Sequence, residues 1–322
     1  MTNSEMRRGD VVEVRSAAEI IATLDENGAL DGLPFMPEMV DMCRRRFTVD
    51  RRTEKMCNTV STAGPSCELS SAVFLDDLRC DGAGHSGCQA ECRLYWKEAW
   101  LRRVEPNIPA TSADDDNESV TRLRSLVERN ATRPGTTPVR FTCQATEFLA
   151  ATRPLSTMDP APYLREYRNG NVPLVHFVSV MARASVIQPL NKLGLLADPH
   201  VKGKLTTSPV TEPLNLQAGE WVRVKTRKQV SETLTTKGKN RGLHFDREML
   251  PFCGRTMQVR RRVTEIINER TGEMIRLDND CIVLEQGVCS GERSPGRWFC
   301  ARQIYPYFRE CWLERVEPPD LS

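Results

Sequence analysis

Apolar and polar residues alternate at two distant places in the chain, in VVEVRS at residues 11–16 and in WVRVKT at residues 221–226. This period of two residues predicts a half-buried β-strand in each place. After the first strand, SAAEIIATLD at residues 16–25 predicts a short helix, with Ser16 as its N-cap and Glu19 completing a capping box. Further apolar runs and turn dipeptides follow both strands, so each region is predicted to hold about five short strands.

The two regions are similar well beyond their opening strands. Residues 9–52 align without a gap with residues 219–262, and the closing segments WLRRVEP and WLERVEP end the two regions. The shared positions include turn glycines, an aromatic residue, a Glu-Met pair and a cysteine: Gly28/Gly238, Gly32/Gly242, Phe35/Phe245, Glu38/Glu248, Met39/Met249 and Cys43/Cys253. Similarity of this extent indicates an internal duplication rather than a solenoid, whose repeats are usually about 20–50 residues long.

Each copy is predicted to form a small barrel, and its opening GD-V-V strand resembles those of SH3-like barrels. Residues 107–218 differ, with a Pro-, Ser- and Asp-rich linker followed by predicted helices at 118–130 and 172–190, the second mostly buried. The predicted fold class is mainly β with α, comprising two SH3-like small barrels that are related by internal duplication and joined by a helical bridge. The predicted domains are residues 1–106, 107–218 and 219–322.

Composition excludes several classes of partner. The formal net charge is +2 over 322 residues, which gives no support for nucleic acid or an anionic membrane as the main partner. No segment approaches the roughly 18 uncharged apolar residues of a membrane span. The polar beginning MTNSEMRRGD lacks the apolar region of a signal peptide, so we expect a cytoplasmic protein.

Cysteine is the residue type that carries candidate chemistry. The chain has 12 cysteines, and a reducing cytoplasm favours metal ligation or redox chemistry over disulfides. About half of them are expected to be plain buried residues, since cysteine is often buried. The duplication matches three positions in both copies, which favours shared thiolate chemistry: Cys43/Cys253, Cys80/Cys289 and Cys88/Cys300.

These matched positions predict one metal site in each copy. The first site is predicted to use Cys43, Cys80, Cys88 and either Cys92 or His85. The second copy has Ile304 where the first has Cys92, so its predicted ligands are Cys253, Cys289, Cys300 and Cys281. Thiolates with at most one imidazole suit zinc, and three or four thiolates suit an iron–sulfur cluster equally. The sequence leaves zinc and iron–sulfur open as cofactors.

The remaining cysteines are assigned individually. Cys311 is predicted to serve packing in the closing strand region. Cys57 and Cys67 are predicted to be surface thiols or alternative ligands. Cys143, in a CQATE segment that echoes CQAEC at residues 88–92, is assigned to the core, with completion of a metal site as the alternative.

The segments LRCDGAGHSGCQAEC at residues 78–92, FCGR at 252–255 and CSG with RWFC between residues 289 and 300 carry a resemblance. The chain resembles an uncharacterised family of duplicated, cysteine-containing bacterial proteins that share these motifs. The resemblance covers most of both copies. It implies no established activity, but it makes the cysteines a family feature.

The function predicted from the sequence is a cytosolic thiolate metalloprotein that acts as a binding or accessory module for a small molecule, a carrier or a protein partner. The alternative is a zinc or iron–sulfur enzyme with an open coordination position in a specialised biosynthetic pathway. A nucleic-acid-binding tandem barrel is third. The chain lacks HExxH, GxSxG, Walker A and GxGxxG motifs, so whether it is an enzyme stays open.

Overall fold

The computed structural model describes residues 5–60, 66–105, 116–156, 159–192 and 201–319, which form two compact units. The first unit consists of Met1–Val178, Ile267–Ile275 and Phe299–Arg302. The second consists of Ser179–Ile266, Arg276–Trp298 and Gln303–Ser322. The predicted bridge at 107–218 is therefore divided between the two units. Most of the predicted linker, residues 106–115, lies outside the described residues.

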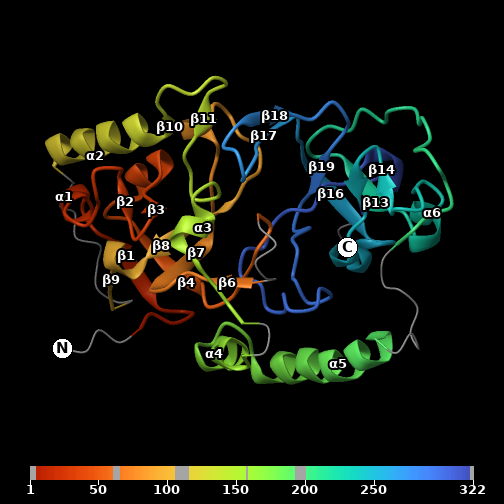
Figure 1. Ribbon diagram of the computed structural model, residues 1–322, viewed down its shortest axis with the longest axis horizontal. Helices are drawn as coiled ribbons and strands as arrows, with labels where there is room; N and C mark the ends of the chain where they lie inside the picture. The colour runs from red at the N-terminus through yellow and green to blue at the C-terminus, as the bar shows by residue number, and fades with distance from the viewer. Residues whose placement is uncertain (1–4, 61–65, 106–115, 157–158, 193–200, 320–322) are drawn as a thin grey trace. The chain divides into compact units, whose positions relative to one another are not determined.

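The first unit is built around a curled antiparallel sheet in the strand order β8–β7–β4–β1–β9 (Figure 1). Its strands are β1 (Val11–Val14), β4 (Arg46–Arg52), β7 (Ala72–Arg79), β8 (Arg93–Lys97) and β9 (Leu101–Arg103). Val12 and Val14 of β1 are fully buried in the core, but Glu13 between them is only 3% exposed, so the predicted half-buried alternation is wrong. A register shift between Val49 and Arg51 marks a bulge where β4 pairs with β7, which bends the sheet.

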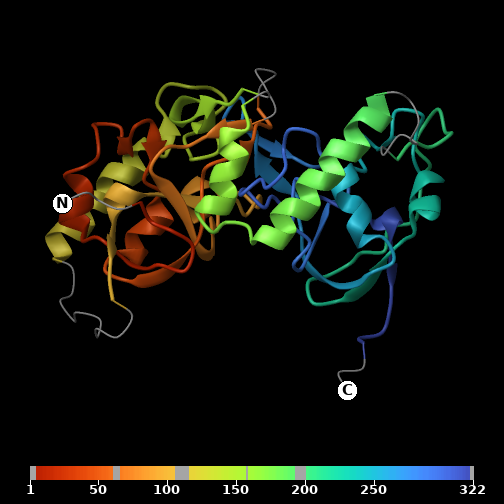
Figure 2. The same ribbon diagram turned by 90° about the horizontal axis from the view of Figure 1, so that it is seen from below.

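Shorter elements complete the first unit. Its other strands are β2 (Ala29–Leu30), β3 (Leu33–Pro34), β5 (Met56–Cys57), β6 (Ser66–Glu68), β10 (Thr132–Arg133), β11 (Arg140–Phe141) and β12 (Arg153–Pro154). Its helices are α1 (Ala17–Ile21), α2 (Asn117–Asn130), α3 (Phe148–Ala151) and α4 (Ala161–Arg168), with 3-10 turns η1 (Pro37–Met42), η2 (Ala83–His85) and η3 (Glu98–Trp100). The α2 helix lies beside α1 and buries Leu123 and Val127 (Figures 1 and 2).

The predicted capping box at the start of α1 is confirmed. The Glu19 N–H donates to Ser16 Oγ at 3.2 Å, and the Ser16 N–H donates to Glu19 Oε2 at 3.1 Å. The N-terminal amides of a helix have no partner within the helix, so this reciprocal pair satisfies two exposed donors.

Two late segments of the chain return to the first unit. The first return segment, Ile267–Ile275, lies against β11, because the Phe141 N–H donates to Gly272 O at 2.7 Å. The second return segment, Phe299–Arg302, ends at Arg302, which is only 4% exposed. Its guanidinium donates to Thr59 Oγ1 at 2.7 Å and to Glu269 Oε1 at 2.9 Å, and it lies 4.6 Å over the Phe148 ring. This buried ion pair joins both return segments to the first unit.

The second unit repeats the order of elements seen in the first. Its sheet runs β19–β16–β13–β20, with β13 (Trp221–Val224), β16 (Thr256–Arg262), β19 (Ile282–Leu284) and β20 (Leu313–Arg315). Its other elements are α6 (Arg227–Ser231), β14 (Lys239–Asn240), β15 (Leu243–His244), η4 (Arg247–Phe252) and η5 (Glu310–Trp312). The strands β17 (Glu265–Ile267) and β18 (Met274–Arg276) each have residues in both units. Val11 pairs with Thr48 in the first sheet, and Trp221 pairs with Gln258 at the aligned positions of the second. The chain is therefore mixed α and β with curled antiparallel sheets.

The helix predicted at 172–190 is present as α5 (Leu174–Lys192), but the prediction that it is mostly buried is wrong. Leu174, Val175 and Val178 are 52%, 83% and 54% exposed. Apolar residues occur on all sides of this helix, so the sequence pattern marks no single buried face, and only some of these residues meet a partner. None of the helices in the described part of the chain is long and apolar enough to cross a membrane.

Candidate metal centre

Three side chains of types that can bind a metal ion meet in the first unit. One ligand atom each from Glu38, Cys80 and His85 lies within 4.8 Å of the other two. Glu38 comes from η1, Cys80 directly follows β7, and His85 ends η2 in the same connection. Among the described residues, this is the one group of three or more such ligands.

Glycines let the β7–β8 connection close tightly over η1. The Cys80 N–H donates to Cys92 O at 2.8 Å, which joins the two ends of the connection. Gly82 has a φ of +78°, and a Cβ there would lie 2.1 Å from Cys88 O. A Cβ on Gly84 would lie 2.8 Å from Pro37 Cγ of η1. Only glycine allows these two approaches, which carry His85 towards Glu38.

The hydrogen bonds of His85 leave one of its ring nitrogens free within this group. His85 is 1% exposed, and its Nε2 donates to the backbone carbonyl of Thr142 at 3.2 Å. That bond leaves Nδ1 as the atom with a free lone pair, and Nδ1 is buried without a hydrogen-bond partner. Both carboxylate oxygens of Glu38 are also buried, and the Cys80 thiol is the neighbouring donor. Buried polar atoms nearly always have partners, so the unpartnered Nδ1 beside a buried carboxylate and a thiol is what a cation site would require.

Burial and neighbouring charge set the ionisation of the group. Burial raises the pKa of the Cys80 thiol, and the adjacent Glu38 carboxylate raises it further. Burial lowers the pKa of His85, although Glu38 and the Thr142 carbonyl oppose that shift. A divalent cation at this point would offset the carboxylate charge and favour the thiolate.

The aligned carboxylate of the second unit is surrounded by hydrogen-bond donors. Glu248, which aligns with Glu38, accepts a hydrogen bond from the Arg293 N–H at 2.8 Å. It also accepts from Ser294 Oγ at 2.8 Å and Ser290 Oγ at 3.3 Å. The second carboxylate is therefore satisfied by ordinary donors, whereas the neighbouring donor of the first is a thiol.

The residues around the second carboxylate explain this difference. The connection from Cys289 to Ile304 is three residues longer than that from Cys80 to Cys92, and Ser294 follows Cys289 by five residues, as His85 follows Cys80. The Cys289 N–H donates to Ile304 O at 2.8 Å, as the Cys80 N–H does to Cys92 O. The second connection thus has the hydroxyl of Ser294 and the apolar side chain of Ile304 where the first has an imidazole and a thiol.

The structure brings together only part of the first predicted ligand set. Cys43 follows η1 and packs against the core outside the group. Cys88 is buried, and its Sγ accepts from the Ile267 N–H at 3.4 Å. Cys92 lies close enough to Cys80 to raise the pKa of that thiol. Burial raises the pKa of Cys92 itself to about 12, with smaller contributions from Cys143 and Cys88 among its neighbours.

The second predicted set is spread over both units. Cys300 belongs to the first unit, whereas Cys253, Cys281 and Cys289 belong to the second. Cys281 is buried, and its Sγ accepts from Arg309 Nη1 at 3.3 Å. Within the described ranges, none of these thiols belongs to a group of three close ligands.

The individual assignments of the other cysteines have mixed outcomes. Cys311 is confirmed as a packing residue in the core of the second unit. The prediction that Cys57 and Cys67 are surface thiols is wrong, because they are only 5% and 2% exposed. They lie on paired strands β5 and β6, which the sequence pattern did not predict because both are very short. Cys143 is confirmed as a buried core residue.

Glu38 is the member of this group that the sequence did not predict. Its alignment with Glu248 was visible, but an isolated glutamate usually lies in a solvated surface. The helical turn after Pro37 buries Glu38 beside a connection that is far away in sequence. Only that long-range approach distinguishes it from an ordinary acidic residue.

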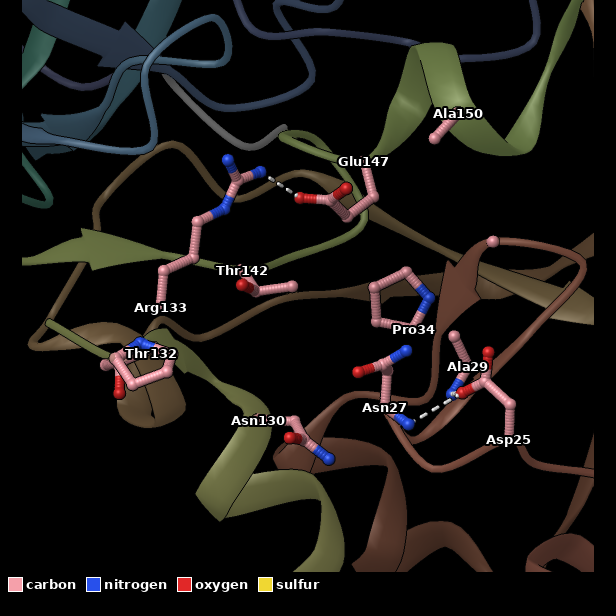
Figure 3. Close-up of a pocket in the computed structure, with 12 residues that line it drawn as sticks. Asp25, Asn27, Ala29, Pro34, Asn130, Thr132, Arg133, Thr142, Glu147 and Ala150 are labelled. Atoms are coloured by element: carbon pink, nitrogen blue, oxygen red, sulfur yellow. Dashed lines mark hydrogen bonds and ion pairs between the residues drawn. The ribbon is translucent and has the colours of Figure 1, made fainter. Parts of the chain in front are cut away.

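A polar pocket is formed by residues of the first unit (Figure 3). Its volume is about 470 Å³, and Thr142, whose carbonyl accepts from His85, is among its lining residues. Arg133 and Glu147 point toward one another across it and form an ion pair at 2.6 Å. Asn27 and Asn130 add amide groups to the lining. Such a surface suits a small polar molecule.

The chain matches no protein-family model, no curated protein and no solved structure. The resemblance to a bacterial family with LRCDG and CSG motifs stays a prediction.

Proposed function

We propose that the protein is a zinc-binding module whose ion is held by Glu38, Cys80 and His85. The observation that carries this proposal is the meeting of three different ligand atoms within 4.8 Å, with His85 Nδ1 buried and unpartnered beside the buried Glu38 carboxylate. Zinc binds sulfur, imidazole nitrogen and carboxylate oxygen together. Iron–sulfur clusters are held mainly by thiolates, so this ligand set favours zinc over a cluster.

Cys92 is proposed as the fourth ligand of a closed, structural site. Its backbone is already tied to Cys80, and its thiol is a near neighbour of the Cys80 thiol. A four-coordinate ion would join η1 to both ends of the β7–β8 connection. Structural zinc sites are usually tetrahedral and contribute directly to folding free energy.

The proposal includes a common origin of the two units from a duplicated SH3-like barrel in a cytoplasmic protein. The equivalent strand pairings and capping boxes at aligned positions support this origin. Zinc is proposed for the first unit alone, since Ser294 and Ile304 replace two ligands in the second. The second unit would keep its shape through the hydrogen bonds of Glu248 instead.

The direct test is the metal content of protein purified without added metal or chelator. We expect about one zinc ion per chain in the wild type. Cys80→Ser and His85→Gln are each expected to weaken zinc binding by more than about tenfold, since even outer-shell changes often cost that much. Cys289→Ser and Glu248→Gln, at the aligned positions of the second unit, are expected to keep the full zinc content.

Two results would contradict this assignment. Full zinc content in Cys80→Ser and His85→Gln would show that these residues do not bind the ion. Loss of one of two zinc ions in Cys289→Ser would instead support a metal site in each unit, as the cysteine pairs predict.

A second candidate function is an enzyme with an open zinc position, and the adjacent pocket is the observation that favours it. Thr142 both lines the pocket and accepts the His85 hydrogen bond, so a bound molecule would lie close to the ligand shell. Catalytic zinc usually has three protein ligands and a water molecule. If Cys92→Ser keeps its zinc, and cobalt in place of zinc shows an unchanged number of thiolate bonds, the open site is favoured over the closed one.

A further inference from the structure

A second pair of cysteines meets in the first unit, and the proposed zinc site does not use it. The Cys57 N–H donates to Cys300 Sγ at 3.1 Å. The Cys57 thiol also hydrogen-bonds to the same sulfur. The two residues are 5% and 2% exposed, so this contact is made in the interior. The internal repeat aligns Cys300 with Cys88 and does not relate it to Cys57. The sequence therefore did not predict this contact.

Backbone contacts on both sides of the pair hold the two sulfurs together. The Ala301 N–H donates to Lys55 O at 3.3 Å, and Arg302 Nη1 donates to Cys57 O at 3.2 Å. The return segment Phe299–Arg302 therefore lies along β5 in a fixed register. The approach of the two thiols follows from this register and does not depend on a flexible side chain.

The surroundings of Cys300 favour a thiolate. The cationic residue whose charge acts on it is Lys55, which is 1% exposed. The pKa of Cys300 is lowered to about 6, first by the hydrogen bond from the Cys57 thiol. Burial opposes this shift, whereas the backbone amides of Arg302 and Cys57 and the charge of Lys55 assist it. Cys300 is thus an activated nucleophile beside a second thiol, the arrangement of redox-active cysteine pairs.

We propose that Cys57 and Cys300 form a redox-active dithiol that small peroxides oxidise to an intramolecular disulfide. The Cys300 thiolate attacks one oxygen of hydrogen peroxide, the O–O bond breaks, and the departing hydroxide takes a proton to leave as water. This step oxidises Cys300 to a sulfenic acid. The Cys57 sulfur then attacks the Cys300 sulfur, the S–O bond breaks, and a second water leaves. Two thiols and one peroxide thus give one disulfide and two waters.

Burial determines which oxidants reach this pair. Hydrogen peroxide is little larger than water and can reach an interior sulfur during local opening, whereas bulky disulfides and peptide substrates cannot. The product would link β5 covalently to the return segment, across a separation of 243 residues in the chain. A cross-link over so long a loop stabilises the folded state mainly by restricting the unfolded chain.

The test treats the full-length, zinc-loaded wild type with hydrogen peroxide, blocks the remaining thiols under denaturing conditions, and identifies linked peptides by mass spectrometry. We expect a Cys57–Cys300 link as the first disulfide. Its rate of formation is expected to rise about tenfold per pH unit below pH 6 and to level off above about pH 7, because the thiolate is the reacting species. Cys57→Ser is expected to stop at a sulfenic acid on Cys300, which dimedone traps.

Cys67→Ser is the matched control, because Cys67 is also buried and lies on the strand paired with β5. That variant is expected to form the same link at the wild-type rate. The proposal is overturned if Cys57 and Cys300 stay reduced while the half-buried Cys289 is oxidised. A rate that keeps rising to about pH 9, as for an ordinary thiol, would also overturn it. Both outcomes are read from the wild type, so they do not depend on a variant folding.

Discussion

At the scale of single residues, Glu166 is a carboxyl group in the interior of the first unit. It is fully buried, its Oε2 accepts from Asn171 Nδ2 at 2.7 Å, and its Oε1 has no hydrogen-bond partner. Burial raises the pKa of Glu166 to about 8, although Asn171, Arg51 and Lys55 act in the opposite direction. The folded protein therefore favours the protonated acid.

This shift predicts a specific dependence of stability on pH. The folded pKa of about 8 lies above the ordinary value of 4.5, so the stabilising contribution is complete below about pH 4.5 and is lost as pH rises toward 8. Glu166→Gln keeps an uncharged acceptor and should remove that loss. The free energy of unfolding of the variant, relative to wild type, should rise by roughly 1.4 kcal/mol per pH unit within this window.

Denaturant unfolding at several pH values between 5 and 8 measures this difference. Glu128→Gln, at an exposed position of α2, is the control for loss of one negative charge. A Glu166→Gln variant whose advantage over wild type is the same at pH 5 and pH 8 would show that Glu166 is ionised throughout.

At the scale of elements, the β7–β8 connection contains two glycines with nearly the same backbone but different surroundings. Gly82 and Gly87 have φ values of +78° and +80°. A Cβ on Gly82 would collide with Cys88 O, whereas a Cβ on Gly87 would meet nothing within 4 Å. Alanine substitutions at the two positions therefore separate two losses of stability: that due to the left-handed backbone alone, and that due to a collision with neighbouring backbone.

Gly87→Ala is expected to lower the free energy of unfolding by about 1 kcal/mol, the usual cost of this conformation for a residue with a side chain. Gly82→Ala must also move the connection away from Cys88, so it should lose more stability and release zinc. Thermal unfolding and zinc content of both variants measure this. Equal zinc content in the two variants would mean that the shape of this connection does not determine metal binding.

The same scale shows what the sequence could and could not predict. The strands, the Ser16 capping box and the turn glycines follow from local patterns, and the repeat supplied each of them twice. The grouping of cysteines does not follow from local patterns. Cys300 meets Cys57 because a return segment enters the first unit, and Glu38 becomes a ligand candidate because η1 lies beneath a distant connection. Both approaches depend on tertiary packing.

At the scale of the whole molecule, the path of the chain differs from two independent repeats in series. The repeat predicted a boundary between the copies, but contacts assign Ile267–Ile275 and Phe299–Arg302 to the first unit. Their removal would leave Phe141 without its Gly272 partner and Phe148 without the guanidinium above it. Buried apolar surface and backbone groups would then be exposed, which costs stability in proportion to the area uncovered.

A fragment of residues 1–218 tests this dependence, because it contains the whole first repeat and the following helices but neither return segment. We expect it to unfold at a lower temperature and less cooperatively than the full chain, and its Cys57 to react rapidly with a thiol reagent. The physical reason is that Cys57 loses the neighbours that bury it, namely Cys300 and Arg302.

The full chain carrying Arg302→Lys is the comparison for the fragment. It keeps both return segments and the positive charge. A lysine cannot make the bonds of the guanidinium to Thr59 and Glu269 at once in the same geometry. Its melting temperature should fall between those of the fragment and the wild type. A fragment that melts cooperatively at the wild-type temperature with a protected Cys57 would show that the first repeat folds without the returning chain.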